Sequence, residues 1–367
     1  TGIQFMPFNT LFQVYAMVRE RSPLLDAAAD LLFMPDLFNY LLTGRKAAEL
    51  TIASTSQLLD PRTKTWIPGL FQAMGLSKKV LQDLVEPGTV LGPLAEDVAA
   101  DTGYRQVPVV ATASHDTASA VAAVPAEGLN WAYISSGTWS LVGVEEPAPV
   151  ISESSLEANF TNEGGVAGTV RFLKNVSGLW LIQGCRKAWS ADGAVTYDDL
   201  TRAALDAPAF AALIDPDSPR FLNPPDMPEA IAGYCLATNQ APPMTRAAMI
   251  RSLLESLALK YRHVLEQLRL VLGHPIEKIH VIGGGSRNTL LCQLTADATR
   301  IPVVAGPAEA TAIGNILVQA MATGRVASLA EMRAIIRESF ELRTYAPSGS
   351  QAAWDAAYVR FRGLLEA

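Results

Sequence analysis

Asp116 stands where a carboxylate is well placed to do chemistry. The apolar, β-branched residues 107–112 before it predict a buried strand, and the small residues 117–121 after it favour a helix. In open α/β sheets ligands bind beyond the carboxyl ends of the strands, so this acid would meet a substrate hydroxyl there. An Asp between a strand and a helix is also a common helix cap, and this stretch alone leaves that alternative open.

A second stretch, Ser135-Ser136-Gly137-Thr138, has the composition of a phosphate-binding turn. It lies between two aromatic and β-branched runs, residues 131–134 and 139–144, which together predict a β-hairpin. Small residues let backbone N–H groups approach a phosphate closely, and the hydroxyls of Ser and Thr add donors. The same residues also make ordinary turns that bind nothing.

The third stretch is Gly283-Gly284-Gly285-Ser286-Arg287-Asn288, between a predicted strand at 279–282 and a predicted helix through 290–298. Glycines at a strand end allow the backbone to pack against a nucleotide, and the helix beginning near Asn288 would point its N-terminus at that space. The spacing does not match GxGxxG with an acid about 20 residues later, so it argues against a dinucleotide-binding Rossmann unit. A tight turn without a ligand is the alternative.

Composition excludes several classes of protein. The chain has 367 residues, of which 49% are hydrophobic and 18% charged, enough for one large or two ordinary domains. A net charge of −7 with scattered basic residues argues against nucleic acid as a partner. Neither a membrane span nor a signal peptide is predicted. Three separated cysteines without CxxC spacing indicate a cytoplasmic protein, and four histidines without HxxxH spacing argue against a protein-held metal.

The elements needed to position these stretches predict an α/β chain with two domains. Residues 1–66 are expected to be helical, with the apolar run 31–42 packed in a core, and residues 67–106 to be rich in loops. The Pro-Ala-Glu-Gly at 125–128 predicts a boundary, with a first domain at 1–124 and a second at 125–367. In the second, we expect a strand at 169–173, a surface excursion at 206–243, a long helix at 245–272 and further helices from 328 onward.

Together these motifs resemble the FGGY-type sugar kinases, within the actin/hexokinase-like (ribonuclease-H-like) fold. The resemblance covers nearly the whole chain in the same order. It rests on the segments Gly2-Ile3-Gln4-Phe5-Met6-Pro7-Phe8-Asn9-Thr10, Ala113-Ser114-His115-Asp116-Thr117-Ala118-Ser119-Ala120, Ser135-Ser136-Gly137-Thr138-Trp139-Ser140, Thr161-Asn162-Glu163-Gly164-Gly165 and Leu173-Lys174-Asn175.

The resemblance implies roles for individual residues. Asp116 would be the general base that takes the proton of a sugar hydroxyl as it attacks the γ-phosphate of ATP. Its sugar-binding companions would be His115, Thr117 and Asn175. The residues expected to bind ATP are Thr138, Gln183, Gly284, Gly285 and Asn288. Mg²⁺ would arrive with the ATP, and no residue of the chain is assigned as its ligand.

The sugar implied is L-rhamnulose, phosphorylated at its 1-hydroxyl. Another ketose or polyol, such as fuculose or xylulose, is the alternative within the class. Thr1-Gly2-Ile3 matches the interior of the family's first domain and not its opening Asp-x-Gly phosphate loop, so we expect the first lobe to be incomplete and this chain alone to be impaired. A non-catalytic sugar- or nucleotide-binding remnant of a kinase is the alternative from a different class.

Overall fold

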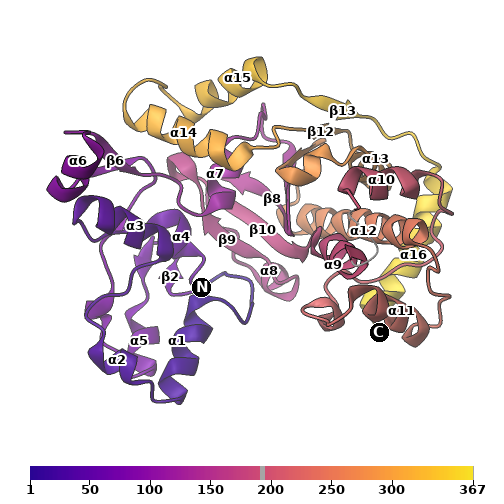
Figure 1. Cartoon of the computed structure of the whole chain (residues 1–367), viewed down its shortest axis with the longest axis horizontal. Coiled ribbons are helices and arrows are strands. Elements are labelled where there is room, and N and C mark those ends of the chain that lie inside the picture. Colours follow the sequence, from indigo (N-terminus) through magenta and orange to yellow (C-terminus); the bar gives the residue numbers. More distant parts are fainter. Residues whose placement is uncertain (191–194, 367) are drawn as a thin grey trace. The chain divides into compact units, whose positions relative to one another are not determined.

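The computed structural model describes residues 1–190 and 195–366, which form two compact units (Figure 1). The first unit consists of Thr1–Pro125, Val144–Lys174 and Ala310–Ser339, and the second of Ala126–Gly143, Asn175–Glu309 and Phe340–Ala367. Neither unit is continuous in sequence, because two later segments pack with the first 125 residues. The domain boundary placed after residue 124 stays a prediction.

The first 125 residues form short strands joined by short helices. The strands pair two by two: β1 (Ala48–Glu49) lies parallel to β4 (Leu84–Val85), and two antiparallel pairs join β2 (Leu59–Asp60) to β3 (Thr65–Trp66) and β5 (Thr89–Pro93) to β6 (Pro108–Ala111). The helices are α1 (Thr10–Arg19), α2 (Pro23–Ala27), α3 (Met34–Thr43), α4 (Leu50–Ser54), α5 (Pro68–Ala73), η1 (Lys78–Val80), α6 (Glu96–Thr102) and α7 (Asp116–Ala122). A small core of Ala48, Leu50, Ala53 and Leu59 holds β1, α4 and β2 together.

Helix α3 contradicts the expectation that residues 31–42 pack in a core. Its apolar side chains face solvent, with Phe38 59% and Leu41 57% exposed. The buried residue of this helix is instead Asp36, whose Oδ1 accepts a hydrogen bond from the backbone N–H of Glu49. A buried polar contact, and not the apolar run, therefore fixes α3 against β1.

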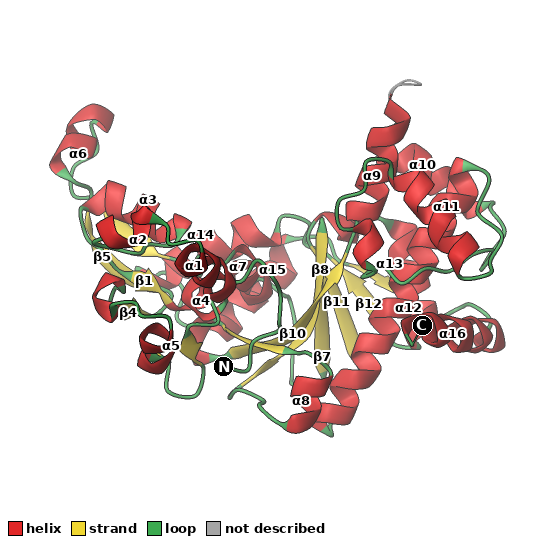
Figure 2. Cartoon of the chain, turned by 90° about the horizontal axis from the view of Figure 1, so that it is seen from below, coloured by secondary structure: helices red, strands yellow, loops and turns green. Residues whose placement is uncertain are grey.

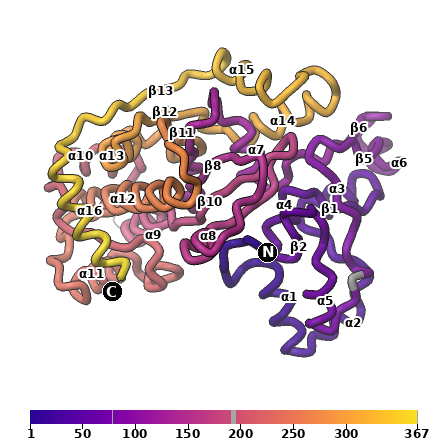
Figure 3. The backbone as a smooth tube through the Cα atoms, turned by 180° about the vertical axis from the view of Figure 1, so that it is seen from behind, coloured from indigo at the N-terminus to yellow at the C-terminus, as the bar shows by residue number. Residues whose placement is uncertain are grey.

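Two later segments complete the first unit. One contains α8 (Glu153–Glu157), β9 (Thr161–Gly164), η2 (Val166–Gly168) and the start of β10 (Val170–Ser177), which pairs antiparallel with β9. The expected strand at 169–173 is thus longer and continues through Ser177. The other contains α14 (Ala310–Ala322) and α15 (Leu329–Ser339), and Figure 3 shows α14 beside α7. A Cβ on Gly314 would lie 1.8 Å from the carbonyl oxygen of Ser119, so the two helices meet backbone to backbone.

The second unit is built on a sheet whose strands follow the order β13-β12-β11-β7-β8 (Figure 2). Strands β7 (Trp131–Ser136) and β8 (Trp139–Glu146) form the predicted hairpin, and β11 (Lys278–Ile282) is parallel to both β7 and β12 (Val303–Ala305). Strand β13 (Arg343–Tyr345) closes the sheet antiparallel to β12. The predicted hairpin at 131–144 and the predicted strand at 279–282 are confirmed.

Helix α12 (Arg246–Leu272) is the long helix predicted at 245–272. Thr245 caps its start by accepting from the N–H of Ala248, and Gly273 ends it at φ 73°, a conformation that favours glycine. Helices α10 (Tyr197–Leu205), α13 (Thr289–Thr299) and α16 (Gln351–Leu365) pack against it (Figure 1). The other helices in the described part of this unit are α9 (Trp180–Trp189), η4 (Pro219–Phe221), α11 (Met227–Ala237) and η5 (Gly284–Arg287).

The segment at 206–243 is more than a surface excursion, because α11 buries Ile231 and Cys235. The apolar residues of α11 have helical spacing, but the many prolines that flank this helix made the segment resemble a loop. No helix in the described part of the chain is long and apolar enough to cross a membrane.

Candidate functional site

Asp116 is the first residue of α7, directly after the turn that follows β6. Its side chain is 78% exposed, and its Oδ1 accepts from the backbone N–H of Thr117 at 2.7 Å. In the described residues its Oδ2 has no hydrogen-bond partner. The carboxylate is therefore oriented through one oxygen and presents the other to solvent, which a residue acting only as a cap would not require.

The turn before Asp116 is held in place by a buried carboxylate. Glu49 is fully buried, and its Oε2 accepts from the backbone N–H of Ser114 at 3.0 Å and from the Thr51 hydroxyl at 2.5 Å. Thr51 Oγ1 in turn accepts from the backbone N–H of His115 at 3.1 Å. Burial raises the pKa of Glu49, against the lowering effect of the hydrogen bonds from Thr51.

A second buried acid, Asp36, contacts Glu49. Burial raises the pKa of Asp36 to about 7. Because Asp36 accepts from the backbone N–H of Glu49, the chain of contacts from Asp36 through Glu49 and Thr51 reaches the turn that carries His115. The position of the candidate base thus depends on two acids that are far from it in sequence.

His115 lies between Asp116 and a buried ion pair. Its Nε2 is 3.6 Å from Asp116 Oδ1, and its Nδ1 is 3.0 Å from Arg171 Nη2 and 3.3 Å from Glu163 Oε2. Arg171 and Glu163 are themselves 3.1 Å apart through Nη1 and Oε2. Although burial raises the pKa of Glu163, the charge of Arg171 and the contact with His115 outweigh it and hold that pKa below its ordinary value.

In the second unit, the hairpin tip is tied to the start of α9. The carbonyl of Gly137 accepts from the N–H of Leu179, and the carbonyl of Thr138 accepts from those of Gly178 and Trp180. A Cβ on Gly178 would lie 2.6 Å from the backbone of Trp139, so only glycine fits there. The Thr138 hydroxyl donates to Gln183 Oε1 at 3.3 Å, which brings these two predicted site residues together.

The glycine loop lies against the same hairpin. Gly283 has φ 79°, and a Cβ on Gly285 would lie 2.0 Å from the Ser136 hydroxyl, whereas one on Gly284 would meet nothing within 4 Å. Asn288 caps α13, accepting from the N–H of Leu291 at 2.9 Å, and its Nδ2 donates to Thr201 Oγ1 at 3.4 Å. The predicted helix start at Asn288 is confirmed.

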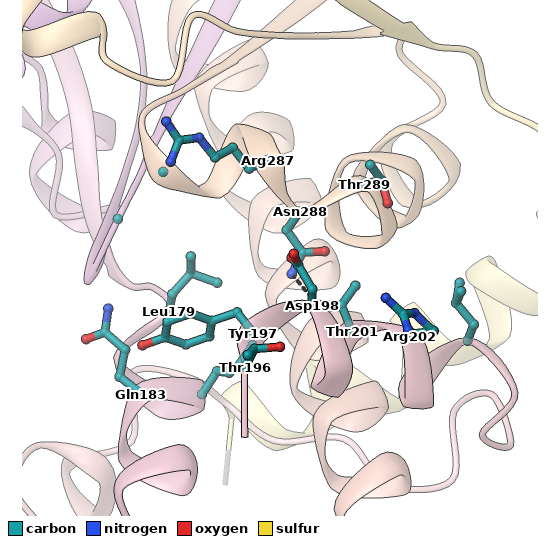
Figure 4. Close-up of a pocket in the computed structure, with 14 residues that line it drawn as sticks. Leu179, Gln183, Thr196, Tyr197, Asp198, Thr201, Arg202, Arg287, Asn288 and Thr289 are labelled. Atoms are coloured by element: carbon teal, nitrogen blue, oxygen red, sulfur yellow. Dashed lines mark hydrogen bonds between the residues drawn. The ribbon is translucent and has the colours of Figure 1, made fainter. Parts of the chain in front are cut away.

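A cavity of about 740 Å³ opens between the hairpin tip, the glycine loop, α9 and α10 (Figure 4). Its size suits a nucleotide, since ligand pockets generally measure about 300–1,000 Å³. Its lining residues are Gly137, Leu179, Ile182, Gln183, Thr196, Tyr197, Asp198, Thr201, Arg202, Leu205, Gly284, Arg287, Asn288 and Thr289. Two arginines and one aspartate leave this lining with an excess of positive charge, which favours an anionic ligand.

The predicted residues therefore fall into two groups. His115, Asp116 and Thr117 lie together in the first unit, while Gln183, Gly284 and Asn288 line the cavity of the second. Thr138 and Gly285 adjoin that cavity through Gln183 and the hairpin. Asn175 lies on β10 in the second unit and does not line the cavity.

In each of the two groups, some neighbouring residues were not predicted from the sequence. Helix α10 supplies Tyr197, Asp198 and Arg202 to the cavity, and no spacing in its sequence marks them. Glu163 and Arg171 were missed beside His115, although a charged residue within the apolar strand predicted at 169–173 was a signal that could have found Arg171.

Comparison with known proteins identifies the family to which this chain is similar. Residues 1–123 match the model for the N-terminal domain, and residues 132–323 that for the C-terminal domain, of the FGGY family of carbohydrate kinases. A rhamnulokinase from Bacteroides thetaiotaomicron is 51% identical over 365 residues, which cover 100% of this chain and 74% of that protein. A rhamnulokinase from Pectobacterium carotovorum subsp. carotovorum is 46% identical over 367 residues, covering 100% and 72%.

Solved structures share the fold at much lower identity. A ligand-bound xylulose kinase from Lactobacillus acidophilus superposes with a TM-score of 0.78 at 17% identity, covering 100% of this chain and 73% of that one. A Plasmodium falciparum glycerol kinase with ADP gives a TM-score of 0.74 at 14% identity, with the same coverage. These likenesses confirm the fold class expected from the sequence.

Proposed function

Because the chain belongs to the FGGY family of carbohydrate kinases, we propose that it transfers the γ-phosphoryl group of ATP to the 1-hydroxyl of L-rhamnulose. The products are L-rhamnulose 1-phosphate and ADP. The observation that carries the choice of sugar is the identity of 40–51% to several proteins named rhamnulokinase, matched over 94–100% of this chain. The exposed carboxylate and the cavity described above support the type of reaction.

We assign the role of general base to Asp116. As the sugar oxygen attacks the γ-phosphorus, its proton passes to the carboxylate, the bond from phosphorus to the β-γ bridging oxygen breaks, and ADP leaves with that electron pair. An exposed carboxylate with one oxygen lacking a partner is suited to receive this proton. His115, Thr117 and Asn175 are proposed to bind the sugar.

The nucleotide is proposed to occupy the cavity of the second unit. Gly284 and Gly285 leave room for the backbone to approach it, and Thr138, Gln183 and Asn288 offer neutral polar groups at its edge. Such groups orient a nucleotide without trapping it, because their hydrogen bonds are individually modest. ADP can then leave after each turnover.

We propose that Mg²⁺ accompanies the nucleotide, where it neutralises phosphate charge. The ion would be held mainly by phosphate oxygens and water, as is usual for Mg²⁺ in kinases. We place the reaction in the cytoplasm, because it consumes ATP.

The test is ADP release from Mg-ATP with L-rhamnulose, L-fuculose, D-xylulose or no sugar, together with phosphorus NMR of the product. We expect the highest kcat/KM with L-rhamnulose and a phosphate monoester on its primary carbon. Faster turnover of L-fuculose or D-xylulose would overturn the sugar assignment and keep the reaction type. Release that does not depend on any sugar would overturn the kinase proposal itself.

A further inference from the structure

The surroundings of His115 determine which of its ring nitrogens carries a proton. Arg171 is fully buried and Glu163 is 4% exposed, and both reach the Nδ1 side of the ring. A guanidinium has donors only and does not lose its proton in proteins. At 3.0 Å from Arg171 Nη2, Nδ1 can therefore only accept, and the proton of a neutral ring must lie on Nε2.

The opposite arrangement is disfavoured by the same contacts. A proton on Nδ1 would point at Glu163 Oε2, 3.3 Å away, but it would also face the N–H of Arg171. Two donors directed at each other repel, and in a buried setting the repulsion is weakly screened. Glu163 is engaged with Arg171 at 3.1 Å and so keeps the guanidinium in place. Arg171 Nε also donates to the carbonyl of Gly164 at 2.9 Å, which fixes its plane.

The protonated edge of the ring faces the candidate base. Nε2 lies 3.6 Å from Asp116 Oδ1, so its N–H is directed at the side of the site that the sugar is proposed to enter. Among the described residues, the charged groups around the ring are Asp116 on α7, Glu163 on β9, Arg171 on β10 and Glu49 at the start of α4, which holds the backbone of Ser114. Of these four groups Glu163 and Arg171 contact Nδ1, and they act in opposite directions on the charge of the ring.

We propose that Arg171 and Glu163 are positioning residues that keep His115 a neutral imidazole with its proton on Nε2. The ring then offers one N–H donor, at Nε2, to a sugar oxygen beside Asp116. The part of this inference that concerns the sugar rests on the proposed function, whereas the protonation state of the ring does not.

The test is ¹⁵N NMR of the chain labelled at histidine, recorded against pH without sugar or nucleotide. His115→Gln identifies the signals of His115 among the four histidines. We expect the neutral ring of the wild type to show a protonated Nε2 and an unprotonated Nδ1. A wild-type ring with its proton on Nδ1 would overturn the proposal.

Two substitutions should act differently on the position of the His115 proton. Arg171→Met removes the donor that faces Nδ1 and leaves Glu163 as an acceptor there, so the ¹⁵N signals of the neutral ring should show the proton on Nδ1. Glu163→Gln keeps Arg171 as the donor to Nδ1, so the proton should remain on Nε2. Glu145→Gln is the matched control, because it neutralises another carboxylate of this unit that pairs with an arginine, Arg333 at 2.8 Å, and should leave the proton on Nε2.

A merely structural role of the pair would not move the proton, so a proton that stays on Nε2 in Arg171→Met would contradict the proposal. If Arg171→Met does not fold, the wild type and Glu163→Gln decide, and a proton on Nδ1 in either protein overturns it. In turnover assays Arg171→Met should lower kcat/KM for the sugar about tenfold with little change in KM for ATP. Absence of turnover with every sugar would count against the proposed function and leave the NMR result standing.

Discussion

Around Asp116 the first unit buries four charged groups, Asp36, Glu49, Glu163 and Arg171, whereas the residues proposed to bind ATP in the second unit are glycines and neutral polar side chains. Buried charges fix positions strongly, and they also make the arrangement depend on protonation. Glycines contribute space, which has no dependence on pH. The comparison teaches that the chemical step should be sensitive to single charges and nucleotide binding to single methyl groups.

Among the neutral residues proposed to bind ATP, the largest effect is expected from Gly285→Ala. The new Cβ would lie 2.0 Å from the Ser136 hydroxyl and 2.4 Å from its Cβ, so the loop and the hairpin must move apart. We expect a loss of about 3 kcal/mol in the free energy of unfolding and weaker ADP binding by calorimetry. Gly284→Ala is the control, since its Cβ meets nothing within 4 Å and should leave the melting temperature unchanged. Equal melting temperatures of the two variants would contradict the claim that a methyl group is excluded at Gly285 and tolerated at Gly284.

On the charged side, Asp36→Asn should remove a dependence of stability on pH. Burial raises the pKa of Asp36 from 3.8 to about 7, so the folded state binds this proton more tightly than the unfolded state. Stability contributed by the neutral acid is therefore complete below about pH 4 and declines as the pH rises toward 7.

The amide introduced by Asp36→Asn would keep the acceptor for Glu49 without this decline. Urea unfolding should show the variant more stable than the wild type at pH 7.5 by on the order of 2 kcal/mol, and nearly equal to it at pH 4. Asp26→Asn, on the exposed part of α2, is the control and should change neither value. If the difference in free energy of unfolding between Asp36→Asn and the wild type is the same at pH 7.5 and at pH 4, the raised pKa of Asp36 is contradicted.

A smaller effect is expected from Gln183→Leu at the cavity edge. The substitution removes the acceptor of the Thr138 hydroxyl and one neutral polar group of the lining. One such hydrogen bond contributes about 1 kcal/mol, so KM for ATP should rise about fivefold while kcat changes little. Ser190→Ala, at the far end of α9, serves as the control in steady-state assays. A fall in kcat with constant KM would show that Gln183 acts on the chemical step.

The sequence predicted those parts of the site that are continuous in the chain. The turn at His115-Asp116-Thr117, the hairpin tip and the glycine loop each combine a strand signal, small residues and a helix signal within a few positions. Local backbone preferences decide such stretches, and the structure contains all three. The cap at Asn288 and the stop at Gly273 were predictable for the same reason.

The contacts made over long sequence separations were not predictable in this way. Glu49 and Glu163 lie 65 and 48 residues from the turn that they contact at Ser114 and His115, and only the packing of strands brings them there. Phe38 and Leu41 were expected in a core because apolar runs are typical of buried elements. The run itself does not indicate which other element would pack against it. Hydrophobic pattern predicts elements better than it predicts their partners.

The most direct test of the account compares Asp116→Asn with the wild type in two assays on the same preparation. ADP binding is measured by calorimetry, and turnover of L-rhamnulose by ADP release. The account predicts an ADP dissociation constant within about twofold of the wild type and a kcat lowered by about 100-fold or more, because a general base contributes at least that much. Turnover that survives the substitution would contradict the role of Asp116.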